Sequence, residues 1–260
     1  MMSVRQPAVA GTFYPANKTA LKDAITHFLA EASEPDFSSR VLIVPHAGYI
    51  YSGEVAASAY KLLERYPHPV ERVILLGPSH RTQLHGLALP GSSVFHTPLG
   101  AIEIDSELAE RLVSFSQVQV LEAAHELEHS LEVQLPFLQV CLPDFKLLPL
   151  VVGEADSMAV SEVLESVWGG PETLIIISTD LSHFHTYHEA QTIDQHTANN
   201  IKDLQSSLTG DQACGCHPLN GLLSLAKEKG MTVETLDIRN SGDTAGSHDR
   251  VVGYGAFAIR

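Results

Sequence analysis

The sequence predicts one α/β domain over residues 1–260, with a central, largely parallel sheet flanked by helices. Two observations predict this class. Short apolar runs rich in branched residues occur at 41–44, 72–76 and 173–178, and such runs are typical of strands buried on both faces. Segments with apolar residues at helical spacing separate the runs, as in folds that alternate strands and helices. The 260 residues, 44% of them hydrophobic, suffice for one such domain and its core.

The remaining elements follow from periodicity and from turn residues. Asp105 is expected to cap a helix, and Gly210 and Gly230 are expected to end two others. Residues 94–96 and 101–104 flank a glycine-containing turn and predict a hairpin. The other predicted strands are 87–89, 146–152, 232–238 and 251–259. The predicted helices are 18–30, 54–63, 105–113, 125–140, 156–167, 187–208 and 218–229.

Composition excludes several classes of partner. The net charge of −15 argues against binding to the phosphate backbone of a nucleic acid, because no basic cluster offsets it. The apolar runs are too short to span a bilayer, and the N-terminus lacks the apolar segment of a secretory signal. Three cysteines are an odd and sparse set, typical of a reducing compartment. We therefore expect a cytoplasmic protein that binds neither nucleic acid nor membrane.

Histidines follow the three most apolar strands, at the point where each strand ends. Pro45 ends the first run and His46 comes next, while His80 follows the second run across a Gly-Pro-Ser turn. The third run is followed by Asp180 and His183. The carboxyl ends of parallel strands meet at one edge of a sheet, where ligands bind in open α/β folds. We therefore expect these side chains to share one cleft, which we call the vestibule.

The residue types in the vestibule predict a metal site. Two neutral imidazoles, from His46 and His80, suit a late first-row metal, and an added carboxylate would complete the facial triad of non-haem Fe(II). Asp180 and His183 are then expected to handle protons or to orient a substrate. We expect His129 to face the same vestibule from its helix as a third catalytic residue, and Cys214 to pack near the site.

A second motif predicts a different chemistry. Residues 125–129, HELEH, match the H-E-x-x-H signature of zinc metallopeptidases. On a helix, His125 and His129 would share one face, with Glu154 as a third ligand. No extended G-x-x-H follows the motif, and the chain is rich in histidine, which raises the number of chance matches. The peptidase is therefore a remote alternative, and we expect Glu126 to point away from the vestibule.

Several stretches together resemble one known family. The sequence is similar to the Memo family, known in prokaryotes as protein B of the AmmeMemoRadiSam system. The matching stretches occur in the family's order over nearly the whole chain: AGTFYP (10–15), VPHAGYIYSG (44–53), LLGPSH (75–80), HELEHSLEVQLPFLQ (125–139), STDLSH (178–183), ACGCHP (213–218) and NSGDTAG…VVGYGAFA (240–258).

The resemblance implies a fold and an activity. The family resembles LigB-type extradiol dioxygenases, which open catechol rings with Fe(II). The resemblance implies metal ligands at His46 and His80, with Asp180 and His183 beside them as catalytic residues. We expect an iron-dependent oxidoreductase of this type, with Cu or Zn as alternative metals and an unknown substrate. The resemblance also implies a functional link to the other AmmeMemoRadiSam proteins.

The residue at the position of the third metal ligand differs from that in the animal relatives. By spacing from the last strand, Thr244 stands where the resemblance implies a cysteine ligand. Threonine is a poor ligand, and Asp243 and His248 are the nearby substitutes. We therefore predict weak metal binding, which Thr244→Cys should tighten if this alignment is right.

A non-catalytic protein is the alternative function. Animal Memo proteins are associated with signalling and with phosphopeptide binding, so the vestibule would then bind a peptide or a small molecule without turnover. A peptide groove should depend on rim residues such as Tyr49 and Tyr51, and its binding should survive chelation. An oxygenase should lose activity on chelation.

Overall fold

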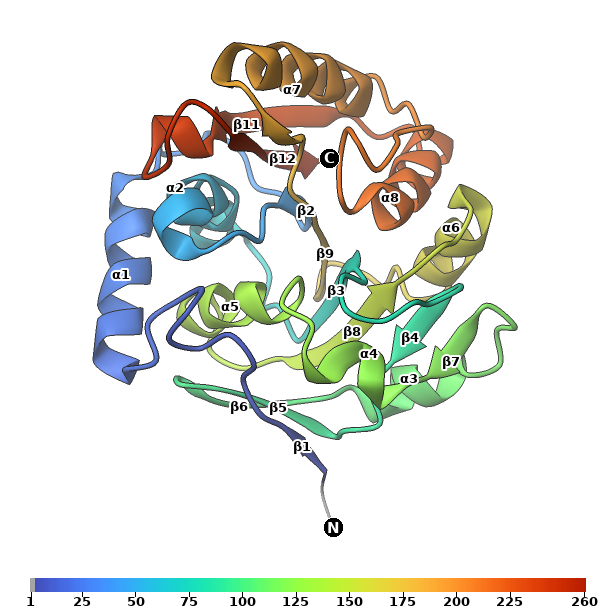
Figure 1. Ribbon diagram of the computed structural model, residues 1–260. Helices are drawn as coiled ribbons and strands as arrows, with labels where there is room; N and C mark the ends of the chain where they lie inside the picture. Colours follow the sequence, from blue (N-terminus) through green and yellow to red (C-terminus); the bar gives the residue numbers. More distant parts are fainter. Residues whose placement is uncertain (1–2) are drawn as a thin grey trace.

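The centre of the fold is a set of parallel strands, as the apolar runs predict. The computed structural model describes residues 3–260 and places β2 (Val41–Val44), β9 (Thr173–Ser178), β3 (Arg72–Pro78) and β8 (Lys146–Val152) side by side in this order (Figure 1). Because β2, β9 and β3 are parallel neighbours, their carboxyl ends lie at the same edge of the sheet. The α/β class and the central parallel strands are confirmed.

The strands that flank the parallel centre of the sheet include more antiparallel pairs than the sequence predicts. On one side, β12 (Val251–Ile259) pairs antiparallel with β2, and β11 (Val233–Asn240) and β10 (His183–His185) pair antiparallel with β12. On the other side, β4 (Leu87–Leu89) is antiparallel to β8 and parallel to β7 (Val118–Val120). The sheet is therefore mixed, with a parallel centre.

A second, smaller sheet carries the predicted hairpin. β5 (Val94–Thr97) and β6 (Gly100–Glu103) pair antiparallel, and β1 (Val4–Arg5) adds to β5 in parallel. The hairpin is confirmed, whereas β1, β7 and β10 are short strands that the sequence pattern did not reveal.

Helices cover both faces of the main sheet, so its strands are buried on both sides. Alternate residues of β2 point in opposite directions: Leu42 and Val44 pack with α1, α2 and α5, whereas Val41 and Ile43 belong to the core beneath α6 and α8. The helices are α1 (Lys18–Glu31), α2 (Tyr49–Tyr60), α3 (Ser106–Leu112), α4 (Glu122–Glu126), α5 (Leu135–Cys141), α6 (Ser157–Ser166), α7 (Tyr187–Lys202) and α8 (Cys216–Glu228), with short 3₁₀ turns η1 (Lys61–Arg65), η2 (Glu132–Gln134) and η3 (Ser241–Asp243).

The predicted helix over 125–140 is the main error, because the segment is broken into three pieces. Helix α4 ends at Glu126, a loop follows, and α5 begins at Leu135 with Pro136 in its first turn, where a missing N–H costs nothing. Leu127, one of the leucines whose helical spacing predicts a single helix here, is 62% exposed. The loop between α4 and η2 carries the side chains of Glu128 and His129 to the ends of β2 and β3.

Candidate metal centre

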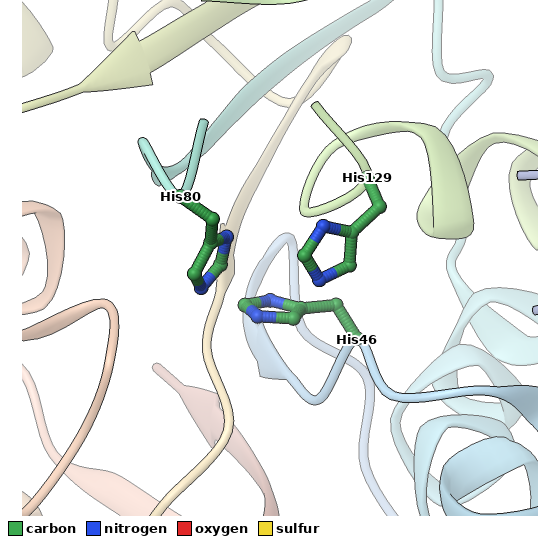
Figure 2. Close-up of side chains that lie close together, drawn as sticks. All are labelled: His46, His80 and His129. Carbon is green, nitrogen blue, oxygen red and sulfur yellow. The ribbon is translucent and has the colours of Figure 1, made fainter. Parts of the chain in front are cut away.

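Three histidines from different parts of the chain converge at the strand ends. His46 follows β2, His80 follows β3, and His129 comes from the loop after α4. One nitrogen of each ring lies within 4.8 Å of a nitrogen of each of the others, and Figure 2 shows the rings facing one another. The centroids of the His80 and His129 rings are 4.6 Å apart. The predicted meeting of His46 and His80 is therefore confirmed, and His129 joins them.

His46 is the buried member of this cluster. Its backbone N–H donates to Oδ1 of Asp180 at 2.7 Å, and its Nδ1 lies 2.9 Å from Oγ of Ser178. The residue is 1% exposed. Burial, and then the neighbouring rings of His80 and His129, lower the pKa of His46 well below its usual value. The imidazole is therefore neutral at physiological pH, which is the form that binds metals.

Glu128 orients the other two histidines, a role that the sequence pattern did not reveal. Its Oε1 lies 2.9 Å from Nδ1 of His80 and accepts from the backbone N–H groups of His129 and Ser130 at 2.9 Å, while Oε2 accepts from the backbone N–H of His80 at 2.6 Å. The Nδ1 of His129 lies 3.2 Å from Oε1 but is not aligned for a hydrogen bond. One buried carboxylate thus positions the ring of His80 directly and that of His129 through its backbone N–H, as carboxylates beside metal-binding histidines do.

The charge of Glu128 is retained in spite of its burial. Burial by itself would raise the pKa of this carboxyl, but His129 and His80 beside it hold the pKa well below its usual range. Glu128 is therefore an anion at neutral pH. It places a negative charge beside the histidine cluster, where a divalent cation would bind.

Asp180 and Cys214 also contact His46. The Sγ of Cys214 lies 3.4 Å from Nε2 of His46 and accepts from the backbone N–H of Asp180 at 3.3 Å. Burial raises the pKa of Asp180, although the N–H of His46 and nearby histidines act against it. The expectation that Cys214 packs near the site is confirmed, and Asp180 is placed beside His46.

The other predicted residues have partners of their own. The Nδ1 of His183 lies 2.9 Å from the carbonyl oxygen of Leu181, and within residues 3–260 the close nitrogen cluster does not include His183. Its role as a catalytic residue stays a prediction. Tyr49, expected on the rim of a peptide groove, is buried, and its hydroxyl donates to the carbonyl oxygen of Val133. That expectation is wrong.

The C-terminal substitutes for a third ligand are also engaged elsewhere. The Asp243 carboxylate accepts from the backbone N–H of Asn240 and from the hydroxyl of Tyr187, and the ring of His248 stacks on that tyrosine. Thr244 donates to the carbonyl oxygen of Ser241. The third imidazole of the cluster comes instead from His129, which the sequence placed in the vestibule but not among the ligands.

The HELEH segment lacks the geometry of a zinc peptidase. Because the helix ends at Glu126, His125 and His129 do not share a helical face. The Nε2 of His125 lies 2.8 Å from the carbonyl oxygen of Ala88 in a buried site. Glu154, the expected third ligand, is exposed and lies 3.1 Å from His85. As expected, Glu126 is exposed and His129 points to the cluster.

The donor set fits a first-row transition metal. Imidazole nitrogens suit Fe, Cu, Ni and Zn. The Nδ1 atoms of His46 and His80 face Ser178 and Glu128, so Nε2 is the nitrogen that each ring can offer to a metal, and that of His46 lies beside the Sγ of Cys214. Within residues 3–260, the buried Nδ1 of His129 has no hydrogen-bond partner, which marks this ring as open to a further contact. His46, His80 and His129 are the residues that would hold the metal.

Access to the cluster is narrow. The side chains of His80 and His129 are 29% and 14% exposed, whereas His46 is almost completely covered. The ring of Phe13 packs on His129 at a centroid distance of 4.8 Å and covers part of it. Cavities of about 760, 340 and 150 Å³ lie elsewhere on the molecule, and the three histidines line none of them. Convergent ligands, rather than cavity size, identify this site.

The fold and the cluster define an α/β protein with a three-histidine centre at the carboxyl edge of its parallel strands. Residues 5–258 match the model of the family described as Memo-like protein. The chain is 37% identical to a MEMO1 family protein of Aquifex aeolicus over 97% of this chain and 98% of that one, and 35% identical to one of Methanobrevibacter smithii over 96% and 98%. The chain belongs to the Memo family.

A solved structure shares the fold at low sequence identity. An uncharacterized protein from Escherichia coli K12 superposes with a TM-score of 0.56 at 13% identity, covering 84% of this chain and 98% of that one. The likeness concerns the fold alone. Within residues 3–260, no helix combines the length and the apolar character needed to cross a membrane.

Proposed function

We propose that this protein is a non-haem, metal-dependent oxidoreductase of extradiol-dioxygenase type that acts on a small molecule. The observation that carries the proposal is the convergence of His46, His80 and His129, whose nitrogens lie within 4.8 Å of one another at the strand edge. The buried carboxylate of Glu128 and the neutral state of His46 support it. Fe(II) is the metal we favour, with Cu and Zn as alternatives.

The residues around the cluster have separate tasks in this proposal. Bound Fe(II) would supply the site at which a catechol-like substrate and dioxygen meet. His46, His80 and His129 hold the metal, and Glu128 keeps two of the rings in place. Asp180, whose pKa is raised by burial, keeps a proton beside the cluster or accepts one from the substrate. His183, the first residue of β10, is proposed to orient the substrate or to share this proton.

The limited exposure of the cluster favours a small molecule over a peptide. A peptide would reach only the partly exposed edges of His80 and His129, and the expected rim residue Tyr49 is buried. We further propose that the protein works in the cytoplasm, which its three free cysteines support. A functional link to the other AmmeMemoRadiSam proteins also belongs to this proposal.

The test combines metal binding with oxygen consumption. Protein purified without oxygen is titrated with Fe(II), Cu(I) and Zn(II) by calorimetry, and the iron form is then assayed for oxygen uptake with a panel of catechols. We expect one metal per chain, with binding lost in His46→Ala and in His80→Ala. Glu126→Gln, at an exposed position of the same motif, is the matched control and should bind metal normally.

The alternatives give different results in the same experiment. A binding protein without turnover would retain ligand binding after chelation and would consume no oxygen with any catechol. Loss of activity in Glu126→Gln, with the fold and bound zinc retained, would revive the peptidase. Wild-type protein that binds none of the three metals would refute the proposal.

A further inference from the structure

The hydroxyl of Ser178, at the end of β9, lies at the centre of a buried hydrogen-bond network. Its Oγ lies 2.6 Å from the carbonyl oxygen of Ser130, 2.8 Å from Nε2 of Gln134 and 2.9 Å from Nδ1 of His46. Ser178, Ser130 and Gln134 are fully buried, and His46 nearly so. No solvent is therefore at hand to replace any of these partners.

The proton positions follow from the chemistry of the partners. A carbonyl oxygen only accepts, so the hydroxyl proton of Ser178 lies on the bond to Ser130. The amide group of Gln134 is oriented by two further contacts: its Nε2 donates to the carbonyl oxygen of Pro45 at 2.8 Å, and its Oε1 accepts from the hydroxyl of Tyr60 at 2.8 Å. Gln134 therefore donates to Ser178 as well.

One acceptor position remains on the Ser178 oxygen, and His46 is the group that faces it. With its only proton already committed to Ser130, the hydroxyl has none to give to the imidazole. The contact at 2.9 Å is then a hydrogen bond in which Nδ1–H of His46 donates. The reverse arrangement would leave the Ser130 carbonyl buried without a donor, which proteins avoid.

We infer that Ser178 is a positioning residue that fixes His46 in the tautomer with its proton on Nδ1, so that Nε2, which lies 3.4 Å from the Sγ of Cys214, carries a lone pair on the side of the histidine cluster. Gln134 supports this assignment by filling the other acceptor position of Ser178. A ring held in this tautomer offers Nε2 to a metal without first exchanging a proton. This consequence for metal binding rests on the proposed function, whereas the tautomer itself does not.

The tautomer can be measured directly in metal-free protein. Protein labelled with ¹⁵N-histidine is examined by long-range ¹H–¹⁵N correlation spectroscopy, which distinguishes Nδ1–H from Nε2–H in each ring. The resonances of His46 are assigned from their loss in His46→Gln. We expect the Nδ1–H form alone in the wild type. The Nε2–H form, or a mixture of the two, would overturn the inference without the need for any Ser178 variant.

Replacement of Ser178 provides the second arm of the test. Ser178→Ala leaves Nδ1–H without an acceptor, so we expect His46 to change to the Nε2–H form, in which the Sγ of Cys214 at 3.4 Å becomes the acceptor. Zn²⁺ affinity, measured by calorimetry, should fall about 10- to 100-fold, as for other groups that orient metal ligands. Ser178→Thr keeps the hydroxyl and should restore both the tautomer and the affinity.

A nearby buried serine is the matched control. Ser182 is also fully buried, but its Oγ has no hydrogen-bond partner, so Ser182→Ala should change neither the tautomer nor the Zn²⁺ affinity. Retention of the Nδ1–H form in folded Ser178→Ala would refute the role of Ser178. If the wild type shows Nδ1–H but binds none of Zn²⁺, Fe(II) and Cu(I), the proposed function fails while the tautomer assignment stands.

Discussion

The sulfur of Cys214 lies 3.4 Å from Nε2 of His46, although 168 residues separate them in the chain. The loop that carries the thiol is fastened to the end of β9, because the backbone N–H of Gly215 donates to Oγ1 of Thr179 at 2.8 Å. Burial, and then the charge of Asp180, raise the pKa of Cys214 to about 12. The metal-free pair is therefore a neutral thiol beside a neutral imidazole, not a thiolate–imidazolium pair.

Gly215→Ala should disrupt the packing of the Cys214 loop against the end of β9. A Cβ at this position would lie 2.7 Å from the Cβ of Thr179 and 2.9 Å from the carbonyl oxygen of Ser178, both of which belong to a fully packed strand end. We expect a loss of about 1–3 kcal/mol in the free energy of unfolding, as for other overpacked sites. Urea denaturation measures it. Gly210→Ala is the matched control, because nothing lies within 4 Å of its Cβ, and equal stabilities would contradict this account.

The elements that local sequence determines were predicted correctly. The branched residues of β2, β3 and β9 leave no alternative to buried strands, and their ends place His46 and His80 together by the geometry of parallel sheets alone. The antiparallel pairing of β12 with β2 was not predictable in this way. It depends on which edge of the sheet a distant segment joins, and nothing in the pattern of 251–259 specifies that edge.

The site shows the same division between local and distant interactions. Leucines at helical spacing predict one helix over 125–140. The side chain of Glu128 instead hydrogen-bonds to His80, 48 residues away, and the residues next to Glu128 are not helical. A helix-like pattern cannot reveal a carboxylate whose partners lie in another loop. The motif HELEH did carry a signal, since His129 belongs to the cluster as expected, but Glu128 was overlooked.

The two glutamates of that motif should behave differently. Glu128→Gln replaces an acceptor of four N–H contacts by a group with its own N–H, so the rings of His80 and His129 lose their common anchor. We expect metal affinity to fall about 10- to 100-fold. Calorimetric titration with Zn²⁺ measures the change, and circular dichroism checks the fold.

The control for this prediction lies two residues away. Glu126 is exposed and has no contact with the histidine cluster, so Glu126→Gln should bind Zn²⁺ as the wild type does. Equal affinities for wild type, Glu128→Gln and Glu126→Gln would show that Glu128 does not orient the ligands.

A buried ion pair ties the N-terminal segment to the loop that carries His129. Nη1 of Arg5 lies 2.6 Å from Oε2 of Glu132, and both side chains are buried. The same carboxylate accepts from the hydroxyl of Tyr14 at 2.5 Å, next to Phe13, whose ring covers His129. Removal of the charge in Glu132→Gln leaves Arg5 buried without its counter-ion, so we expect a loss of about 3–5 kcal/mol in the free energy of unfolding.

The exposed pair of Glu34 is the comparison for this prediction. Glu34 lies 3.1 Å from Nη2 of Arg65, with both side chains more than half exposed. Glu34 also lies 3.1 Å from Nζ of Lys61, but Lys61 keeps a second partner, Glu64, at 2.9 Å. Glu34→Gln should change the free energy of unfolding by no more than about 1 kcal/mol. Guanidinium denaturation of both variants measures the difference, and a small effect of Glu132→Gln would show that the buried pair is dispensable.

The stability of the fold should decrease in mild acid because of His125. Burial, opposed by its hydrogen bond to Ala88, lowers the pKa of His125 to about 4. In the unfolded chain a histidine has a pKa of about 6.5, so between these values the unfolded state binds a proton that the folded state does not. The contribution is therefore fully present above pH 6.5 and is lost as the pH falls toward 4. From pH 7 to pH 5 it amounts to about 2 kcal/mol.

The variant His125→Gln tests this contribution, because it keeps a side-chain N–H for the carbonyl of Ala88 and has no titrating group. Urea denaturation at both pH values should show a decrease that is smaller in His125→Gln than in the wild type by about this amount. Equal pH dependence in the two proteins would mean that the fold does not lower the pKa of His125.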